Sequence, residues 1–443
     1  MGNFSQQQPI HELIRGSLSA ISNRFLLIAQ PGSYRIAPYI RAAKAMGLEI
    51  LIASRGEFSL ITEIHEGLHI DVDDPDAALQ IILAAAADKP FVGVLGCDDT
   101  TVELAAMVAE QLGLPHNPVE AARLSHRKDL ARAHLLQAGC PVPMHCLIDL
   151  SLPPGKQLAG LAPELTWPCV LKPLNLAASR GVMRVNNEAE FIQACQRIRP
   201  IIAHASDPFE RQHILIEEYI EGSEIAFEGY LQDGELHALA LFDKPDPLSG
   251  PFFEETIYVT PSELNGLQQN KIHQRVAEAC VAYGLSNGPV HAELRFNEED
   301  AWILEVATRT IGGDCARMLD NYGNESIEAL TIALACGKTI EPAPAQGARG
   351  VMMIPIPKAG ILRRVEGLPA ARKIKHIDKI EIVIPDGHEL IPLPEGNQYP
   401  GYIFASADDP AAVVAALRKA HEQLRLVIAP LWKIGTASKD RQL

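Results

Sequence analysis

The sequence has no excess of basic residues and no long apolar run. Its 443 residues include 39 Lys and Arg against 55 Asp and Glu, a formal net charge of −16, whereas general binders of nucleic acids or anionic membranes gain affinity from basic surfaces. No run of consecutive apolar residues approaches the length that spans a membrane. The first residues, MGNFSQQQPIHELIRGS, lack the apolar core of a signal peptide. We therefore expect a soluble cytoplasmic protein that binds neither nucleic acid nor membrane.

Paired cysteines and the usual dinucleotide loop are also missing. The eight cysteines include no CxxC pair and no metal-ligand spacing, so reduced thiols in a cytosolic compartment are expected. Cys315 is expected to serve packing rather than nucleophilic chemistry. The loop at 30–33, QPGS, lacks GxGxxG, so a dinucleotide is not inferred there.

The chain is too long for one ordinary core, and its 47% hydrophobic content is enough for two to four domains. Near the N-terminus, an apolar run at 25–29, a helical pattern at 36–46 and a second run at 49–53 predict a β-loop-α-β unit. Such a unit opens a parallel α/β domain. The prolines at 115 and 118 mark a boundary after it.

Two aspartates, Asp98 and Asp99, follow a predicted buried strand at 91–95. The carboxyl ends of strands are where α/β proteins bind ligands. Capping of the next helix is nevertheless the favoured interpretation for these aspartates.

The stretch HAELRFNEEDAWILEVATRTIGG, residues 291–313, alternates apolar and polar side chains and predicts a β-hairpin. With a three-residue loop at 298–300, Asn297 pairs with Ala301 and Glu293 faces Glu305. Like charges opposite each other destabilise a sheet unless a cation lies between them. In this register the other face of the hairpin is apolar and carries Ala292, Leu294, Phe296, Trp302, Leu304 and Val306.

Two carboxylates on one rigid hairpin suit Mg²⁺, a hard ion that takes its remaining ligands from water and substrate phosphates, with Mn²⁺ as a substitute. Arg309 follows four residues after Glu305, and Gly312 and Gly313 allow a close backbone approach. Taken alone, the stretch is explained equally well as a surface hairpin with two solvated glutamates.

Three further features predict contacts to a nucleotide. Lys172 ends an apolar strand, and the small-residue loop at 177–182, AASRGV, can turn backbone N–H groups toward phosphate oxygens. Lys128 lies on a predicted helix at 119–138. The acidic end of the strand at 214–220 can pair with adenine, and a nearby carboxylate can bind ribose. Taken alone, the loop at 177–182 is better explained as an ordinary small-residue turn, and a lone lysine on a helix is usually solvated.

Toward the C-terminus the pattern predicts strands at 351–355, 380–384 and 402–404. A helix that begins at Asp409-Pro410 places an apolar stripe on one side. The stripe comprises Val413, Leu417, Ala420 and Leu424.

The order of these features resembles the ATP-grasp superfamily of carboxylate–amine ligases. The resemblance covers about residues 20–430. It rests on Lys128, VLKP with Lys172, SRGV, IEEYIEGSE, HAE, and LEVATR followed by GG. Within the superfamily the chain looks most like the L-amino-acid ligase branch. The resemblance implies an α/β fold, α+β in part: a Rossmann-like domain at 1–118, an ATP-grasp domain at 119–340 with a lid at about 140–216, and an α+β domain at 341–443.

The resemblance also implies a role for each matching position. Arg309 and Lys172 would be catalytic, with Arg309 stabilising an acyl phosphate. Glu293 and Glu305 would bind the metal ion. Asn is common two residues after the second metal glutamate, and here Ala307 stands there, as in the amino-acid ligase branch. The nucleotide would contact Lys128 and Lys172 (phosphates), Ser179, Arg180 and Gly181 (covering loop), Glu217, Glu218, Tyr219 and Ile220 (adenine), and Glu224 (ribose).

The implied reaction is ATP-dependent amide or dipeptide formation from amino-acid-like carboxylate and amine substrates, through an acyl phosphate. Carboxylation or formyl transfer in the same fold, and a non-catalytic ATP-binding module, are the alternatives. Glu254, Glu255 and Tyr258 are expected near the substrate, although structural glutamates on a strand are equally consistent. A homodimer is common in this family.

Overall fold

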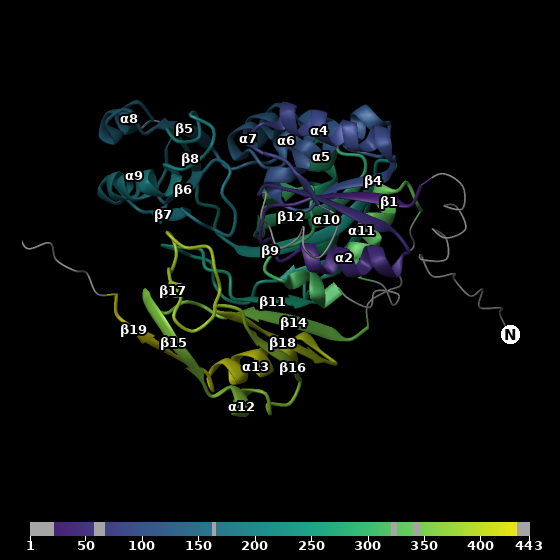
Figure 1. Cartoon of the computed structure of the whole chain (residues 1–443). Coiled ribbons are helices and arrows are strands. Elements are labelled where there is room, and N and C mark those ends of the chain that lie inside the picture. The colour runs from purple at the N-terminus through teal and green to yellow at the C-terminus, as the bar shows by residue number, and fades with distance from the viewer. Residues whose placement is uncertain (1–21, 57–66, 162–164, 320–325, 340–345, 432–443) are drawn as a thin grey trace, which may run out of the picture.

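The computed structural model of the chain describes residues 22–56, 67–161, 165–319, 326–339 and 346–431. The leader MGNFSQQQPIHELIRGS, for which no signal peptide is expected, lies outside these ranges. Within them the chain forms four sheets with helices packed on them (Figure 1). The α/β fold class expected from the sequence is therefore correct. Among the described helices, none combines the length and the apolar character that crossing a membrane requires.

The first sheet is parallel and has the strand order β3-β2-β1-β4. All five residues of β1 are buried because helices cover both of its faces. Phe25 and Leu27 pack in one core, and Leu26 and Ile28 in another on the opposite face. The predicted β-loop-α-β unit is confirmed. Its elements are β1 (Arg24–Ile28), α2 (Ile36–Ala45), β2 (Glu49–Ser54), β3 (Gly67–His69), α4 (Pro75–Asp88), β4 (Phe91–Gly96), η1 (Asp99–Thr101) and α5 (Val102–Leu112).

A small antiparallel sheet of order β5-β8-β6-β7 lies at the upper left of Figure 1, with two helices beside it. Phe191 and Ile198, both fully buried, belong to its core with Leu171 and Ile216. The sheet falls in the segment where the resemblance implies a lid. Its elements are β5 (His145–Asp149), α8 (Pro154–Leu161), β6 (Cys169–Pro173), β7 (Met183–Val185), α9 (Glu188–Ile202) and β8 (His213–Glu218).

The largest sheet has eight strands in the order β13-β12-β9-β10-β11-β14-β18-β16. It continues across residue 340, where a domain boundary is expected, because β11 pairs with β14. Its elements are β9 (Ser223–Gln232), β10 (Glu235–Asp243), β11 (Ile257–Thr260), α10 (Gly266–Tyr283), β12 (Gly288–Phe296), β13 (Ala301–Ala307), η2 (Cys315–Leu319), α11 (Ile327–Ala335), β14 (Ala348–Met353), α12 (Leu368–Ala371), β16 (Ile377–Ile382), β18 (Gly401–Ala407) and α13 (Pro410–His421).

The predicted C-terminal helix is confirmed as α13. Asp409 caps it by accepting a hydrogen bond from the Ala412 N–H, and Val413, Leu417 and Ala420 are fully buried. The fourth sheet completes this part of the chain and has the order β17-β15-β19. Its strands are β15 (Gly360–Glu366), β17 (Glu389–Leu390) and β19 (Arg425–Ala429).

The predicted helix at 119–138 is wrong in one respect, because it is two helices, α6 (Val119–Leu124) and α7 (Lys128–Gln137). Arg127 between them has an extended backbone, with φ −111° and ψ 97°. Lys128 is therefore the first residue of α7, not a mid-helix residue, and its N–H donates to the Leu174 carbonyl at 2.9 Å. The break turns Lys128 toward the strand end that carries Lys172.

The predicted hairpin is confirmed as β12 and β13, and Glu293 does pair with Glu305. The predicted register is wrong near the loop, because a bulge shifts the ladder so that Leu294 pairs with Ile303 and Phe296 with Ala301. The extra residue in β13 is Leu304, which is half-buried and lines a cavity. Leu304 and Trp302 consequently leave the core face, and Ile303 and Ala301 occupy it instead.

Candidate active site

One cavity of about 430 Å³ is lined by residues of the first sheet's loops, the lid-segment sheet and the large sheet. It brings together most of the residues that the sequence nominated. Glu255 and Tyr258 also line it, whereas Glu254 lies outside and accepts a hydrogen bond from the Ile356 N–H at 3.3 Å. The nominated residues in its lining are Lys128, Lys172, Ser179, Glu217, Glu218, Tyr219, Ile220, Glu224, Glu293, Glu305 and Arg309.

Arg180 and Gly181, expected in a loop that covers phosphates, do not line this cavity. Instead the Arg180 Nε donates to the Glu395 carbonyl at 2.9 Å, and the Gly181 N–H donates to the Pro394 carbonyl at 2.9 Å. Gly181 has φ +75°, and a Cβ there would lie 2.6 Å from Pro173 Cγ, so glycine is needed for both reasons. Ser179 alone of the three faces the cavity.

Three cations and two carboxylates form what we call the lysine cluster: Lys128, Lys172, Arg132, Glu217 and Glu305. Glu217 Oε1 lies 2.5 Å from Arg132 Nε, and its Oε2 lies 2.6 Å from Lys172 Nζ. Glu305 Oε2 lies 3.2 Å from Lys128 Nζ. Arg132 also donates to the Leu304 carbonyl at 2.6 Å, which holds the bulge of β13 against α7.

The lysine cluster lacks one anion for charge balance. Glu217 is 1% exposed; burial by itself would raise its pKa, but Arg132 and Lys172 outweigh burial and hold the pKa at about 2. Burial lowers the pKa of Lys172, against the opposing effect of Glu217. With Glu217 ionised, three positive charges face two negative ones. The surplus positive charge fits an anionic ligand with several oxygens, such as a phosphate group.

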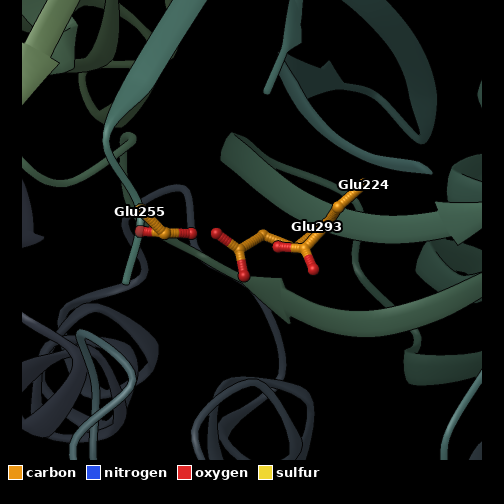
Figure 2. A group of neighbouring side chains, drawn as sticks. All are labelled: Glu224, Glu255 and Glu293. Atoms are coloured by element: carbon orange, nitrogen blue, oxygen red, sulfur yellow. The ribbon is translucent and has the colours of Figure 1, made fainter. Parts of the chain in front are cut away.

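A second group, which we call the glutamate cluster, consists of Glu224, Glu255, Glu293, Lys244 and Arg295. Figure 2 shows the three carboxylates directed toward one another, and their oxygens lie within 4.8 Å. Lys244 Nζ lies among them, 2.7 Å from Glu224, 2.5 Å from Glu255 and 3.1 Å from Glu293. Arg295 Nε lies 3.3 Å from Glu224.

The glutamate cluster lacks one cation. Burial raises the pKa of Glu255 to about 7, and the neighbouring Glu293 and Glu224 add to this effect while Lys244 opposes it. Burial also acts to raise the pKa of Glu293, but Lys244 and His291 together outweigh it and hold that pKa well below its ordinary value. Three carboxylates face Lys244 and Arg295, while His291, 3.7 Å from Glu293, is itself paired with the buried Glu228. Carboxylate oxygens are the donors that hard divalent cations prefer. The donor set therefore fits Mg²⁺.

The two nominated metal ligands, Glu293 and Glu305, belong to different clusters although they face each other across the hairpin. Glu293 contacts Lys244, and Glu305 contacts Lys128. Both are partly exposed, with 24% of each side chain accessible. A cation between the two carboxylates would therefore join the two clusters.

Arg309 is held by Asp99 through two hydrogen bonds, 2.8 Å from Nε to Oδ1 and 3.0 Å from Nη2 to Oδ2. Burial alone would raise the pKa of Asp99, but the Arg309 guanidinium lowers it below the ordinary value. Capping, the favoured interpretation from the sequence, is thus not what the Asp99 carboxylate does, whereas Asp98 does occupy the N-cap position of η1, where its N–H donates to Thr101 Oγ1 at 3.1 Å. The adjacent Asp98 accepts hydrogen bonds from the Gln30 N–H and the Ser33 hydroxyl.

Cys315 lines the cavity but is only 1% exposed. Burial raises the pKa of its thiol well above the ordinary value, which keeps it protonated and unreactive. The expectation that it serves packing stands.

Sequence reasoning missed several residues that hold the site together. Lys244 follows the alternating strand β10 and is the one lysine in FDKPDP, a signal too common to single out.

His291, in the HAE motif, contacts Glu228 at 3.0 Å, and Glu228 accepts a hydrogen bond from the Ile311 N–H at 3.0 Å. Burial lowers the pKa of His291, but hydrogen bonds to Glu228 and Glu293 outweigh it and raise the pKa to about 8. Arg132 stands on α7, one turn after Lys128.

Three family models match successive parts of the chain. The ATP-grasp N-terminal domain matches residues 40–116, the ATP-grasp domain matches 165–318, and the L-amino acid ligase C-terminal domain 2 matches 352–429. Together they account for more than half of the chain.

Two relatives of known activity show modest identity. Alanine–anticapsin ligase from Bacillus subtilis is 26% identical over 289 residues, which are 61% of this chain and 60% of the relative. Carnosine synthase 1 from Homo sapiens is 26% identical over 342 residues, 73% of this chain and 41% of the relative. The matches thus span less than two thirds of the length of either relative.

Solved structures share the fold over nearly the whole chain. The L-amino acid ligase from Bacillus licheniformis superposes with a TM-score of 0.75 at 23% identity, over 93% of this chain and 100% of that one. Phosphoribosylglycinamide synthetase from Anaerococcus prevotii superposes with a TM-score of 0.66 at 18% identity, over 92% and 100%. By these matches the chain carries, in order, an ATP-grasp N-terminal domain, an ATP-grasp domain and an L-amino acid ligase C-terminal domain.

Proposed function

We propose that this protein is an ATP- and Mg²⁺-dependent ligase that joins two amino-acid-like substrates through an amide bond. The observation that carries the proposal is one cavity in which a cluster lacking an anion lies beside a cluster lacking a cation. A magnesium complex of a nucleoside triphosphate meets both needs. Alanine–anticapsin ligase and carnosine synthase 1, whose names describe ligation or synthesis, support the choice of reaction.

ATP would lie with its adenine against the end of β8 and its phosphates on the lysine cluster. The adenine contacts we propose are the backbone of Glu217, Glu218, Tyr219 and Ile220, with Glu224 for ribose. Lys128, Lys172 and Ser179 would contact phosphate oxygens. All of these residues line the cavity.

Glu293 and Glu305 would hold Mg²⁺, or Mn²⁺ in its place, against the phosphates. The bound ion supplies charge neutralisation at the γ-phosphoryl group. Lys244 lies 3.1 Å from Glu293, so its ammonium and the ion share the same carboxylate. We propose that Glu224 and Glu255 keep Lys244 in place when Glu293 turns to the ion.

The reaction would proceed in two displacements. An oxygen of the first substrate's carboxylate attacks the γ-phosphorus, the bond to the β,γ-bridging oxygen breaks, and ADP leaves. The free amine of the second substrate then attacks the acyl carbon of the acyl phosphate, the C–O bond to phosphate breaks, and the amine proton passes to phosphate or water. Arg309, oriented by Asp99, and Lys172 stabilise the negative charge that develops.

Three organisational proposals accompany this function. The domains would be 1–118, 119–340 with a lid at about 140–216, and 341–443, and closure of the lid would protect the acyl phosphate from water. The eight cysteines all lie in the described residues and none forms a disulfide there, which favours a reducing, cytoplasmic location. We also propose a homodimer. The molar mass measured by light scattering on protein eluting from a size-exclusion column would test this.

The deciding experiment is a phosphate-release screen over pairs of amino acids, with mass detection of the product. We expect ADP and phosphate to appear only when both a carboxylate and an amine substrate are present. Release that depends on bicarbonate or formate would favour the alternative chemistry in this fold. Tight ATP binding without any ADP release would favour a binding module.

A further inference from the structure

Arg35 is a buried cation that the proposed chemistry leaves unused. It occupies the N-cap position of α2, where its side chain makes no capping hydrogen bond, and it is 8% exposed. Its Nη1 donates to Thr310 Oγ1 at 2.8 Å, and it forms no ion pair with a carboxylate of any described residue. Its guanidinium stacks on the Tyr34 ring, 5.2 Å from the ring centroid. A buried guanidinium without a negative partner is unfavourable until an anion binds.

Two carboxylates of the cavity wall, Asp98 and Asp99, are already engaged, although the charge of Arg35 helps to lower the pKa of Asp99. Asp99 binds Arg309 through both of its oxygens. Asp98 accepts hydrogen bonds from the Gln30 N–H and the Ser33 hydroxyl. Arg35 and Arg309 thus both line the cavity, and of these two only Arg309 forms an ion pair with a carboxylate of the described residues.

The space beside Arg35 is open to the cavity. Arg35, Tyr34 and Gly312 all line it, and a Cβ at Gly312 would lie 3.7 Å from Arg35 Nη2. The glycine thus leaves room for a ligand group next to the guanidinium. Arg309 also lines this cavity.

We propose that Arg35 binds the carboxylate of the amine substrate, so that the amine substrate is an amino acid with a free α-carboxylate. The inference rests on the proposed function. The carboxylate of the first substrate is consumed in the acyl phosphate and needs no permanent partner, whereas that of the second survives in the product. A planar guanidinium binds such a group through two parallel hydrogen bonds.

The test compares three acceptors with one donor amino acid: an amino acid, the carboxamide of the same amino acid, and hydroxylamine. The amide lacks the acceptor's negative charge, and hydroxylamine, which traps the acyl phosphate as a hydroxamate, lacks the carboxyl group altogether. The variants are Arg35→Gln and Arg35→Lys. Arg41→Gln is the matched control, because Arg41 is an exposed basic residue on the same helix.

We expect Arg35→Gln to lower kcat/KM for the amino-acid acceptor on the order of 10- to 100-fold, as for loss of a charged hydrogen-bond partner. Reaction with the amide, hydroxamate formation and the KM for ATP should stay close to wild type. Arg35→Lys should recover part of the preference for acid over amide, and Arg41→Gln should keep all of it.

An unchanged preference in Arg35→Gln would overturn the assignment. So would an equal loss with all three acceptors, which would place Arg35 in ATP binding, donor binding or folding. A wild-type protein that forms no hydroxamate with any donor would contradict the proposed function itself, and this inference with it.

Discussion

The lysine cluster and the glutamate cluster lie in one cavity and use similar side chains, yet they have opposite charge imbalances. The first places three cations against two carboxylates, and the second places three carboxylates against two cations. Each is nearly balanced, so the chain tolerates both without a ligand. The remaining charge of each cluster has the sign that attracts one half of a metal–triphosphate complex. The difference shows how a protein with a net charge of −16 can prepare a local site for a polyanion.

Removing the carboxylate that links the clusters should have the largest effect. We expect Glu305→Gln to lower the rate of ADP formation by about 10³-fold or more, because the ion loses the ligand nearest the phosphates. Far-UV circular dichroism should show that the fold is retained. Glu298→Gln, in the exposed loop of the same hairpin, is the control. Turnover retained in Glu305→Gln would remove the metal assignment.

Arg309 stands outside both clusters, and its removal separates binding from chemistry. Arg309→Ala should bind ATP almost as wild type does but form product about 10²- to 10³-fold more slowly, since its charge is needed when phosphate leaves. Equilibrium ATP binding and single-turnover rates measure the two effects. A large loss of ATP affinity would instead place Arg309 with the lysine cluster.

The lysine cluster should make stability depend on acid pH. The pKa of Glu217 is about 2 in the folded chain, below its ordinary value of 4.5. Its contribution is therefore fully present above pH 4.5 and is lost as the pH falls toward 2, by roughly 3 kcal/mol in total. Unfolding midpoints measured from pH 5 to pH 2 should fall more steeply in wild type than in Glu217→Gln. Parallel curves would contradict this interpretation.

Lys172→Met tests the charge balance of the lysine cluster directly. Because Arg132 still pairs with Glu217, we expect the chain to fold and the KM for ATP to rise about 10- to 100-fold. The KM values for the two organic substrates, measured at saturating ATP, should change much less. An equal rise in all three would argue against a phosphate contact.

Lys244→Met should produce the smallest change, and its sign is opposite to that of Lys172→Met. Removing this ammonium leaves the glutamate cluster more negative, so Mg²⁺ should bind about tenfold more tightly, because a repelling positive charge is lost and water and salt screen most of its effect. The rise in melting temperature on titration with Mg²⁺ measures this. Weaker Mg²⁺ binding in the variant would show that Lys244 orients the carboxylates rather than competing with the ion.

Much of the fold could be predicted from local pattern. The apolar run of β1, the alternation in β12 and β13, and the Asp409-Pro410 start of α13 are each set by neighbours in the sequence. The break before Lys128 was not predicted, because 119–138 reads as one helix and only contact with the strand end at Leu174 distinguishes two. The bulge at Leu304 was missed for a similar reason, since one inserted residue leaves the alternation on either side intact.

The sequence by itself determined which chemical groups the site contains and their order along the chain, because strand and helix periodicity depend on residues a few positions apart. The tertiary structure alone decided which of those groups are partners. Asp99 and Arg309 are 210 positions apart, and Lys244 reaches Glu293 across 49. The strength of an ion pair depends on distance in space rather than in sequence. Only the tertiary structure therefore shows which charged side chains are balanced by a partner and which leave a charge for a ligand.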